Sequence, residues 1–239
     1  MTMVTVPVKG IVAPNDMADV YSWFGYDVVT PNNISEALNN AAGADVTLEI
    51  NSPGGHVDAG SEIYTAVKKY QGDVTAQIVG QACSAASWIA LAADKVEMSP
   101  TAQIMIHRAS TGVDGNSDDI ASALQSLDSL DKSFVDLYSQ RTGLDKQEVY
   151  RMMCKTTWMN AKEAVDKGFA DSIMFEDNAV PAIVNAYGVP ALSQKMINKV
   201  KNLLHDKSTE NVVKPQPKEN IKNDSQLQKK LAILFGKEN

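Results

Sequence analysis

The sequence has few of the residues that build disulfide frameworks or metal centres. Its 239 residues include two cysteines, Cys83 and Cys154, and three histidines. Two cysteines are too few for a disulfide framework or a structural zinc site, and the histidines lack metal-ligand spacing. We therefore expect two reduced cysteines that serve only in packing.

Long apolar runs are also missing. No stretch approaches the roughly 18–20 apolar residues that span a bilayer, and the N-terminus has no signal-peptide pattern. These absences predict a cytoplasmic protein without membrane contact.

Basic charge is scarce in most of the chain. Residues 193–239 hold ten Lys and five Asp or Glu, a charge of +5, while residues 1–192 hold 12 Lys or Arg and 24 Asp or Glu, a charge of −12. Phosphate contacts need a basic face, so the acidic part argues against nucleic-acid binding.

The composition changes after about residue 192. Residues 208–225 are polar with two prolines and no apolar periodicity, which predicts a disordered linker. Three leucines within 227–234 then mark a short basic amphipathic helix. We predict one domain over 1–192 and a flexible basic tail over 193–239. The tail is either simply solvated or a docking peptide for a partner.

The first part of the chain alternates between strand and helix patterns. Strands are expected at 46–50, 74–79, 95–98 and 103–107, and helices at 58–70, 84–93, 118–141, 145–153 and 161–167. Residues 51–55, Asn-Ser-Pro-Gly-Gly, predict a turn. This alternation indicates an α/β layered domain.

One segment has the pattern of a serine nucleophile. A strand ends at Gly80, and a helix of small residues begins near Ser84. A serine at a helix N-terminus lies beside free N–H groups that can stabilise an oxyanion. Serine is also a common helix cap, so this segment alone is weak.

Two more segments strengthen the interpretation of Ser84 as a nucleophile. Gly54 and Gly55 follow a strand and could turn an N–H outward as a second oxyanion donor, although they could equally form an ordinary turn. His107 ends another strand. Such a histidine is often structural, but it is also the usual base that activates a serine near neutral pH.

The order of these motifs, 50–55, 80–84 and 105–107, resembles the ClpP family of serine peptidases over roughly residues 8–175. The resemblance implies a spiral of β-β-α units, a fold related to that of crotonases, with 118–141 as a protruding handle helix. It also implies a homo-oligomer, possibly of stacked rings, in which handles pair. The pairing stripe would be Leu124, Leu127, Leu130, Phe134 and Leu137; alternatively, the stripe packs on its own domain.

Flanking segments resemble one branch of that family. Residues 23–25, Trp-Phe-Gly, and 157–164, Thr-Trp-Met-Asn-Ala-Lys-Glu-Ala, are similar to head-maturation (prohead) proteases of tailed phages and prophages. The resemblance implies processing of capsid or scaffold protein, in the bacterial cytoplasm or inside the prohead. The basic tail would tether the protease there or be removed by self-cleavage. The resemblance to this branch gives no reason to assume an ATP-driven unfoldase partner.

Roles follow from the resemblance residue by residue. Ser84 would be the nucleophile and His107 the general base, with the N–H groups of Gly55 and Ala85 as the oxyanion hole. No metal or cofactor is implied. Ser87, one turn later, does not align with the family serine.

The third member of the triad departs from the family pattern. The position of the family aspartate is Thr156, which cannot supply a carboxylate. Three readings stay open: a Ser–His dyad in which Thr156 holds the imidazole, replacement by Asp171 or Asp166, or a weak or inactive enzyme. The alternatives are therefore a non-catalytic ClpP-like assembly subunit and, less favoured, a crotonase-like acyl-CoA enzyme. The latter would need no serine nucleophile.

Overall fold

The structure is a computed structural model that describes residues 3–176. Its strands are β1 (Val4–Val12), β2 (Val28–Val29), β3 (Val46–Gly55), β4 (Val74–Cys83), β5 (Lys95–Met98), β6 (Gln103–Ile106), β7 (Thr157–Asn160) and β8 (Ser172–Ile173). Its helices are η1 (Asn15–Met17), α1 (Ala18–Trp23), α2 (Pro31–Ala41), α3 (Val57–Lys69), α4 (Ala85–Leu91), α5 (Ser117–Thr142), α6 (Lys146–Cys154) and α7 (Ala161–Asp166). The predicted tail, 193–239, lies outside the described residues.

The strands form one sheet that divides at β4. The main order is β2-β1-β3-β4-β5-β8, and all of these neighbours are parallel. The first half of β4 pairs with β5, whereas its second half pairs with β6. β7 then adds to β6 as an antiparallel strand. The predicted α/β fold is confirmed.

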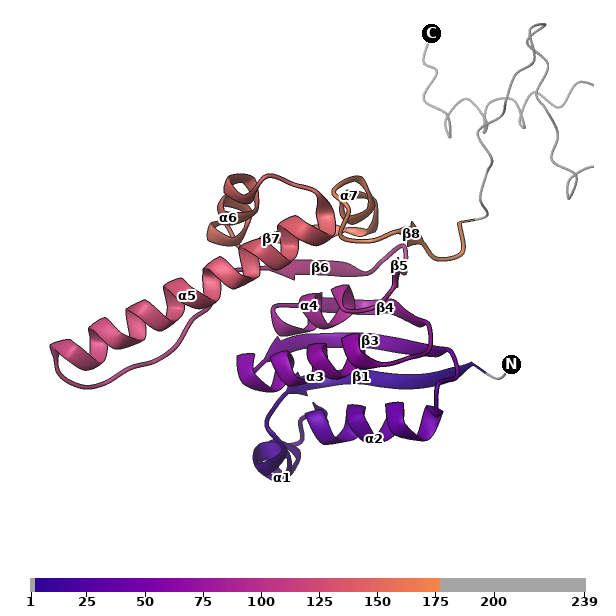
Figure 1. Ribbon diagram of the computed structural model, residues 1–239, viewed down its shortest axis with the longest axis horizontal. Coiled ribbons are helices and arrows are strands. Elements are labelled where there is room, and N and C mark those ends of the chain that lie inside the picture. The colour runs from indigo at the N-terminus through magenta and orange to yellow at the C-terminus, as the bar shows by residue number, and fades with distance from the viewer. Residues whose placement is uncertain (1–2, 177–239) are drawn as a thin grey trace, which may run out of the picture. The chain divides into compact units, whose positions relative to one another are not determined.

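Helices α2, α3 and α4 pack against one another and against the strands of the sheet (Figure 1). β3 and β4 carry the centre of the core, where Leu48, Ile50 and Ile78 are inaccessible to solvent. α4 is buried along its whole length, as its small residues predicted. In β1 and β4, buried apolar residues alternate with less buried ones, so one face of these strands carries the core.

The predicted turn at 51–55 is wrong, because these residues continue β3. Gly54 and Gly55 pair with Ile11 and Val12 of β1, beyond a register shift. Both glycines have positive φ, 86° and 157°, which lets the strand bend without ending. This extension carries the backbone of Gly55 to a pocket that Ser84 and His107 also line.

α5 is the predicted long helix, capped by Asn116 and ended by Gly143 at φ 77°. It extends away from the sheet (Figure 1). Ile120 and Leu124 near its start are exposed, whereas Phe134 and Leu137 pack against the core. The expected pairing stripe therefore divides, and its second part belongs to its own domain. None of the helices within residues 3–176 is long and apolar enough to cross a membrane.

Candidate active site

Ser84 occupies a strained turn between β4 and α4. Its φ and ψ are 52° and −124°, a region that non-glycine residues rarely adopt. Such a conformation costs about 1–3 kcal/mol and clusters at functional sites. The N–H of Ser84 donates to the carbonyl of Met105 on β6 (2.9 Å), and its side chain makes no capping bond to α4. The hydroxyl is therefore not used as a helix cap.

Glycine is required at position 54 because β3 passes directly beside this turn. A Cβ there would lie 2.4 Å from the carbonyl oxygen of Cys83 and 2.8 Å from the Cβ of Ser84. A Cβ at Gly55 would lie 2.0 Å from the carbonyl oxygen of Val12. These two glycines permit the close approach of β3 that the proposed oxyanion hole needs.

Ser87 has a structural task. It is inaccessible to solvent, and its hydroxyl donates to the carbonyl of Ser84 (2.6 Å). Because that hydroxyl has one hydrogen, the 2.7 Å bond between Ser87 and Tyr138 has the Tyr138 hydroxyl as donor. Burial raises the pKa of Tyr138, so this phenol stays protonated. The chain of bonds from α5 through Ser87 fixes the backbone of Ser84.

His107 follows β6 and shares a pocket with Ser84. The pocket has a volume of about 70 Å³. Its lining residues are Gly55, Val57, Ser84, Trp88, His107, Arg108, Ala109, Ser110, Phe134 and Tyr138. The structure thus brings the predicted nucleophile, the predicted base and one predicted oxyanion donor to one pocket. Ala85, the other predicted donor, is the first residue of α4.

Thr156 lies one residue beyond the β6–β7 ladder, as His107 does. The antiparallel register ends with Ile106 paired to Thr157, and these two residues directly adjoin His107 and Thr156 in the chain. Thr156 has φ 50°, an unfavourable value for a β-branched residue. Thr156 is exposed and does not line the pocket of Ser84 and His107.

The two alternative carboxylates lie elsewhere. Asp171 accepts hydrogen bonds from Arg141 (2.6 Å) and from the N–H of Val96 (2.7 Å). Burial raises the pKa of Asp171, but these bonds outweigh it and the net pKa is below its ordinary value. Asp166 pairs with Lys162 on α7. Neither carboxylate lines the pocket of Ser84 and His107.

Asp131 is a site residue that was not identified from the sequence. It lies on α5 with 3% of its surface exposed. Its carboxylate accepts hydrogen bonds from Nε of Arg108 (2.6 Å) and from the N–H of Ala109 (2.9 Å). The available signal was a charged residue at helical spacing within an apolar stripe, four residues after Leu127.

A second, wider groove adjoins the pocket of Ser84 and His107. Its volume is about 640 Å³, and it shares Gly55, Val57, Ala109 and Ser110 with that pocket. Tyr21 of α1 also lines it, and its hydroxyl forms a 3.1 Å hydrogen bond with Nε2 of His56. The groove therefore offers room for an extended substrate on one side of Ser84.

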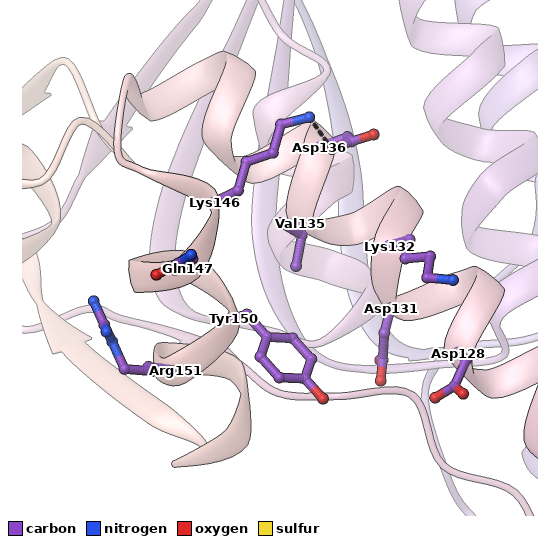
Figure 2. A pocket seen from close by; sticks show the side chains of 9 residues that line it. All are labelled: Asp128, Asp131, Lys132, Val135, Asp136, Lys146, Gln147, Tyr150 and Arg151. Carbon is purple, nitrogen blue, oxygen red and sulfur yellow. Dashed lines mark ion pairs between the residues drawn. The ribbon is translucent and has the colours of Figure 1, made fainter.

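A third cavity, of about 760 Å³, lies between α5 and α6 (Figure 2). Tyr150 of α6 and Asp131 of α5 face one another there, and Lys146 pairs with Asp136 at 2.7 Å. This cavity contains neither Ser84 nor His107. Asp131, which lines this cavity, accepts a hydrogen bond from Arg108, which lines the pocket of Ser84 and His107.

The cysteines do not supply a competing nucleophile. Cys83 is buried beside Ser84, and burial raises the pKa of its thiol to about 11. Cys154 is exposed at the end of α6. Both are free thiols, as predicted, but the exposure of Cys154 shows that the predicted packing role is wrong for this residue.

Comparison with known proteins places this geometry in a family. The family model described as Clp protease matches residues 34–177, more than half of the chain. An ATP-dependent Clp protease proteolytic subunit 1 of Chlamydia abortus is 34% identical over 140 residues, which cover 57% of this chain and 73% of the relative. The subunit of the same name in Chlamydia muridarum is 30% identical over 166 residues, which cover 65% of this chain and 86% of the relative. The chain therefore belongs to the Clp protease family.

Proposed function

We propose that the chain is a serine endopeptidase with Ser84 as nucleophile and His107 as general base. The observation that carries this proposal is the shared pocket, in which a serine on a strained turn and a histidine at a strand end meet beside Gly55. A serine used only as a cap would bond to its helix, and Ser84 does not.

The mechanism follows from these positions. His107 accepts the proton of the Ser84 hydroxyl as Oγ attacks the carbonyl carbon of a peptide bond. The N–H groups of Gly55 and Ala85 donate to the resulting oxyanion. His107 then passes the proton to the leaving amine, which leaves an acyl group on Ser84. Water, deprotonated by His107, hydrolyses this ester and restores the free serine.

The base works as part of a dyad in this proposal. Thr156 lies one residue beyond the end of the β6–β7 ladder, as His107 does, and supplies at most a neutral hydrogen bond to the imidazole. A triad that loses its carboxylate loses about 10⁴ in rate but keeps catalysis from its oxyanion hole and binding. We expect a slow peptidase. The rival, a non-catalytic assembly subunit, is favoured by the same threonine.

The proposed substrate is phage capsid or scaffold protein. The support is the resemblance of residues 23–25 and 157–164 to head-maturation proteases. A slow enzyme suits a substrate that is concentrated and cut few times. Co-expression with a phage capsid or scaffold protein, followed by mass spectrometry of that protein's N-terminus, tests this; an unprocessed protein would contradict it.

The active form is proposed to be a homo-oligomer. The support is the exposed Ile120 and Leu124 on the part of α5 that extends from the sheet, which a second copy would cover. Sedimentation at micromolar concentration tests it, and a monomer alone would contradict it. The named relatives are proteolytic subunits of ATP-dependent proteases, and an unfoldase is not part of this proposal.

Hydrolysis of fluorogenic peptides tests the proposed activity. We expect Ser84→Ala and His107→Ala to abolish turnover, while Ser110→Ala, which alters a serine of the same pocket, retains it. Turnover that persists in Ser84→Ala would exclude this nucleophile. Absence of turnover in wild-type protein, alone and with capsid protein, would favour the assembly subunit.

A further inference from the structure

One carboxylate fastens the two residues after His107 to α5. Asp131 binds the guanidinium of Arg108 through one oxygen and the main-chain N–H of Ala109 through the other. A side-chain and a main-chain donor thus share a single acceptor group. Hydrogen bonds of this charge-assisted kind are short and strong, so the attachment is rigid.

Asp131 differs in burial from Asp128, the other carboxylate near the guanidinium of Arg108. Asp128, one turn earlier on α5, lies 3.6 Å from the same guanidinium, but its side chain is 53% exposed. The side chain of Asp131 is 4% exposed. Arg108 also lies over the ring of Tyr150, 5.5 Å from its centroid. We define the clamp as Asp131, Arg108 and Ala109. Its carboxylate is buried, whereas the Arg108 side chain is 39% exposed and the carboxylate of Asp128 is open to water.

His107 lies between two anchored parts of the chain. The β6–β7 ladder holds the backbone up to Ile106, and the clamp holds the side chain of Arg108 and the main-chain N–H of Ala109. The family position that would orient the imidazole carries Thr156, which has no carboxylate. Orientation of the histidine must then come from its own backbone.

We propose that Asp131 is a positioning residue that acts through Arg108 and Ala109 to hold His107 within reach of Ser84. The inference rests on the proposed roles of Ser84 and His107. Asp131 does not act as the triad acid, because each of its oxygens already accepts a hydrogen bond from the clamp. Its charge is balanced by Arg108, so its contribution is geometric.

The test compares Asp131→Asn with Asp128→Asn in the full-length protein. The asparagine keeps the shape of Asp131 but turns an N–H₂ or a neutral oxygen toward Arg108. Two quantities are measured in each: the second-order rate constant for labelling of Ser84 by a fluorophosphonate probe, and hydrogen–deuterium exchange of the peptide that covers 108–115. Circular dichroism and melting temperature establish that the variants are folded at the assay temperature.

We expect Asp131→Asn to label on the order of 10²-fold more slowly, the effect of a displacement of about 1 Å, and to exchange faster over 108–115. Asp128→Asn should stay within about two-fold of wild type in both, as an exposed ion pair predicts. The kcat for a small peptide ester should fall in Asp131→Asn more than KM changes, because positioning serves the chemical step.

Unchanged labelling in folded Asp131→Asn would overturn the proposal, and so would equal losses in both variants. Faster exchange without slower labelling would show that the clamp orders the loop without serving His107. If Asp131→Asn does not fold, Arg108→Lys replaces it: the charge stays but the Nε donor is lost, and unchanged labelling would again overturn the proposal. Wild-type protein that fails to label at Ser84 refutes the proposed function, while exchange over 108–115 still decides whether the clamp exists.

Discussion

Restoring a carboxylate at position 156 should accelerate the enzyme. Thr156 precedes Thr157, the residue paired with Ile106 at the end of the β6–β7 ladder, so positions 156 and 107 both lie one residue beyond it. Aspartate differs little from threonine in size, and we expect a carboxylate at position 156 to accept a hydrogen bond from the imidazole. The substitution Thr156→Asp thus adds the acid without adding volume.

The backbone favours this change as well. Thr156 has φ 50°, where a β-branched side chain is strained and aspartate is several-fold more common. Loss of the carboxylate from a complete triad costs about 10⁴ in rate, or about 5 kcal/mol of barrier. Because the clamp already constrains His107, we expect Thr156→Asp to recover part of that, on the order of 10- to 10³-fold in kcat/KM.

The assay is peptide hydrolysis at neutral pH with Thr156→Asn as the matched control. Asparagine has the same shape and the same tolerance of positive φ, but no charge, so it should give no such gain. Thr156→Ala tests the neutral hydrogen bond and should lower the rate only if the threonine holds the imidazole. If Thr156→Asp folds and is no faster than wild type, or if Asn and Asp give equal gains, the assignment of position 156 to the histidine is refuted.

Three other measurements probe the site and its frame. Gly54→Ala should destabilise the protein by about 1–3 kcal/mol or more and remove activity, because its Cβ would overlap the turn that carries Ser84. The control Gly112→Ala, whose Cβ would meet nothing within 4 Å, should be neutral. Equal melting temperatures for the two variants would contradict this. At pH 8 iodoacetamide should modify Cys154 and spare Cys83, whose pKa of about 11 leaves about one thiolate in a thousand; early modification of Cys83 would show that the turn opens. The lowered pKa of Asp171 means that it stabilises the fold above the unfolded pKa of about 4 and loses this effect as the pH falls through the lower folded value. Asp171→Asn should therefore melt below wild type at pH 7, with the difference closing under acid conditions, and a constant difference would refute the linkage.

Local patterns predicted much of the frame. The strand over 95–98 was predicted with its observed bounds, and the long helix over 118–141 differs from α5 by one residue at each end. Both have clear signals, an alternation of polar and apolar residues in one case and an apolar stripe closed by Thr-Gly in the other. The site motifs at 54–55, 84 and 107 were also visible as separate segments, and the fold brings 55, 84 and 107 to one pocket.

Tertiary pairing decided what the patterns could not. Residues 51–55 carry turn-forming types, but pairing with the end of β1 keeps them in the sheet. The apolar stripe of α5 did not reveal that Phe134 would pack on Trp88, with ring centroids 4.6 Å apart, while Leu124 stays exposed. Asp131 reads as a surface charge in isolation, and only the return of the chain after β6 supplies its partners.

The most direct test of the central claim is the location of a fluorophosphonate adduct. Purified wild-type, Ser84→Ala and His107→Ala proteins are treated with the probe, alone and with capsid protein, and the modified peptide is identified by mass spectrometry. We expect one adduct, on Ser84, formed far more slowly in His107→Ala and absent from Ser84→Ala. An adduct on another serine, or no adduct under either condition, would contradict it.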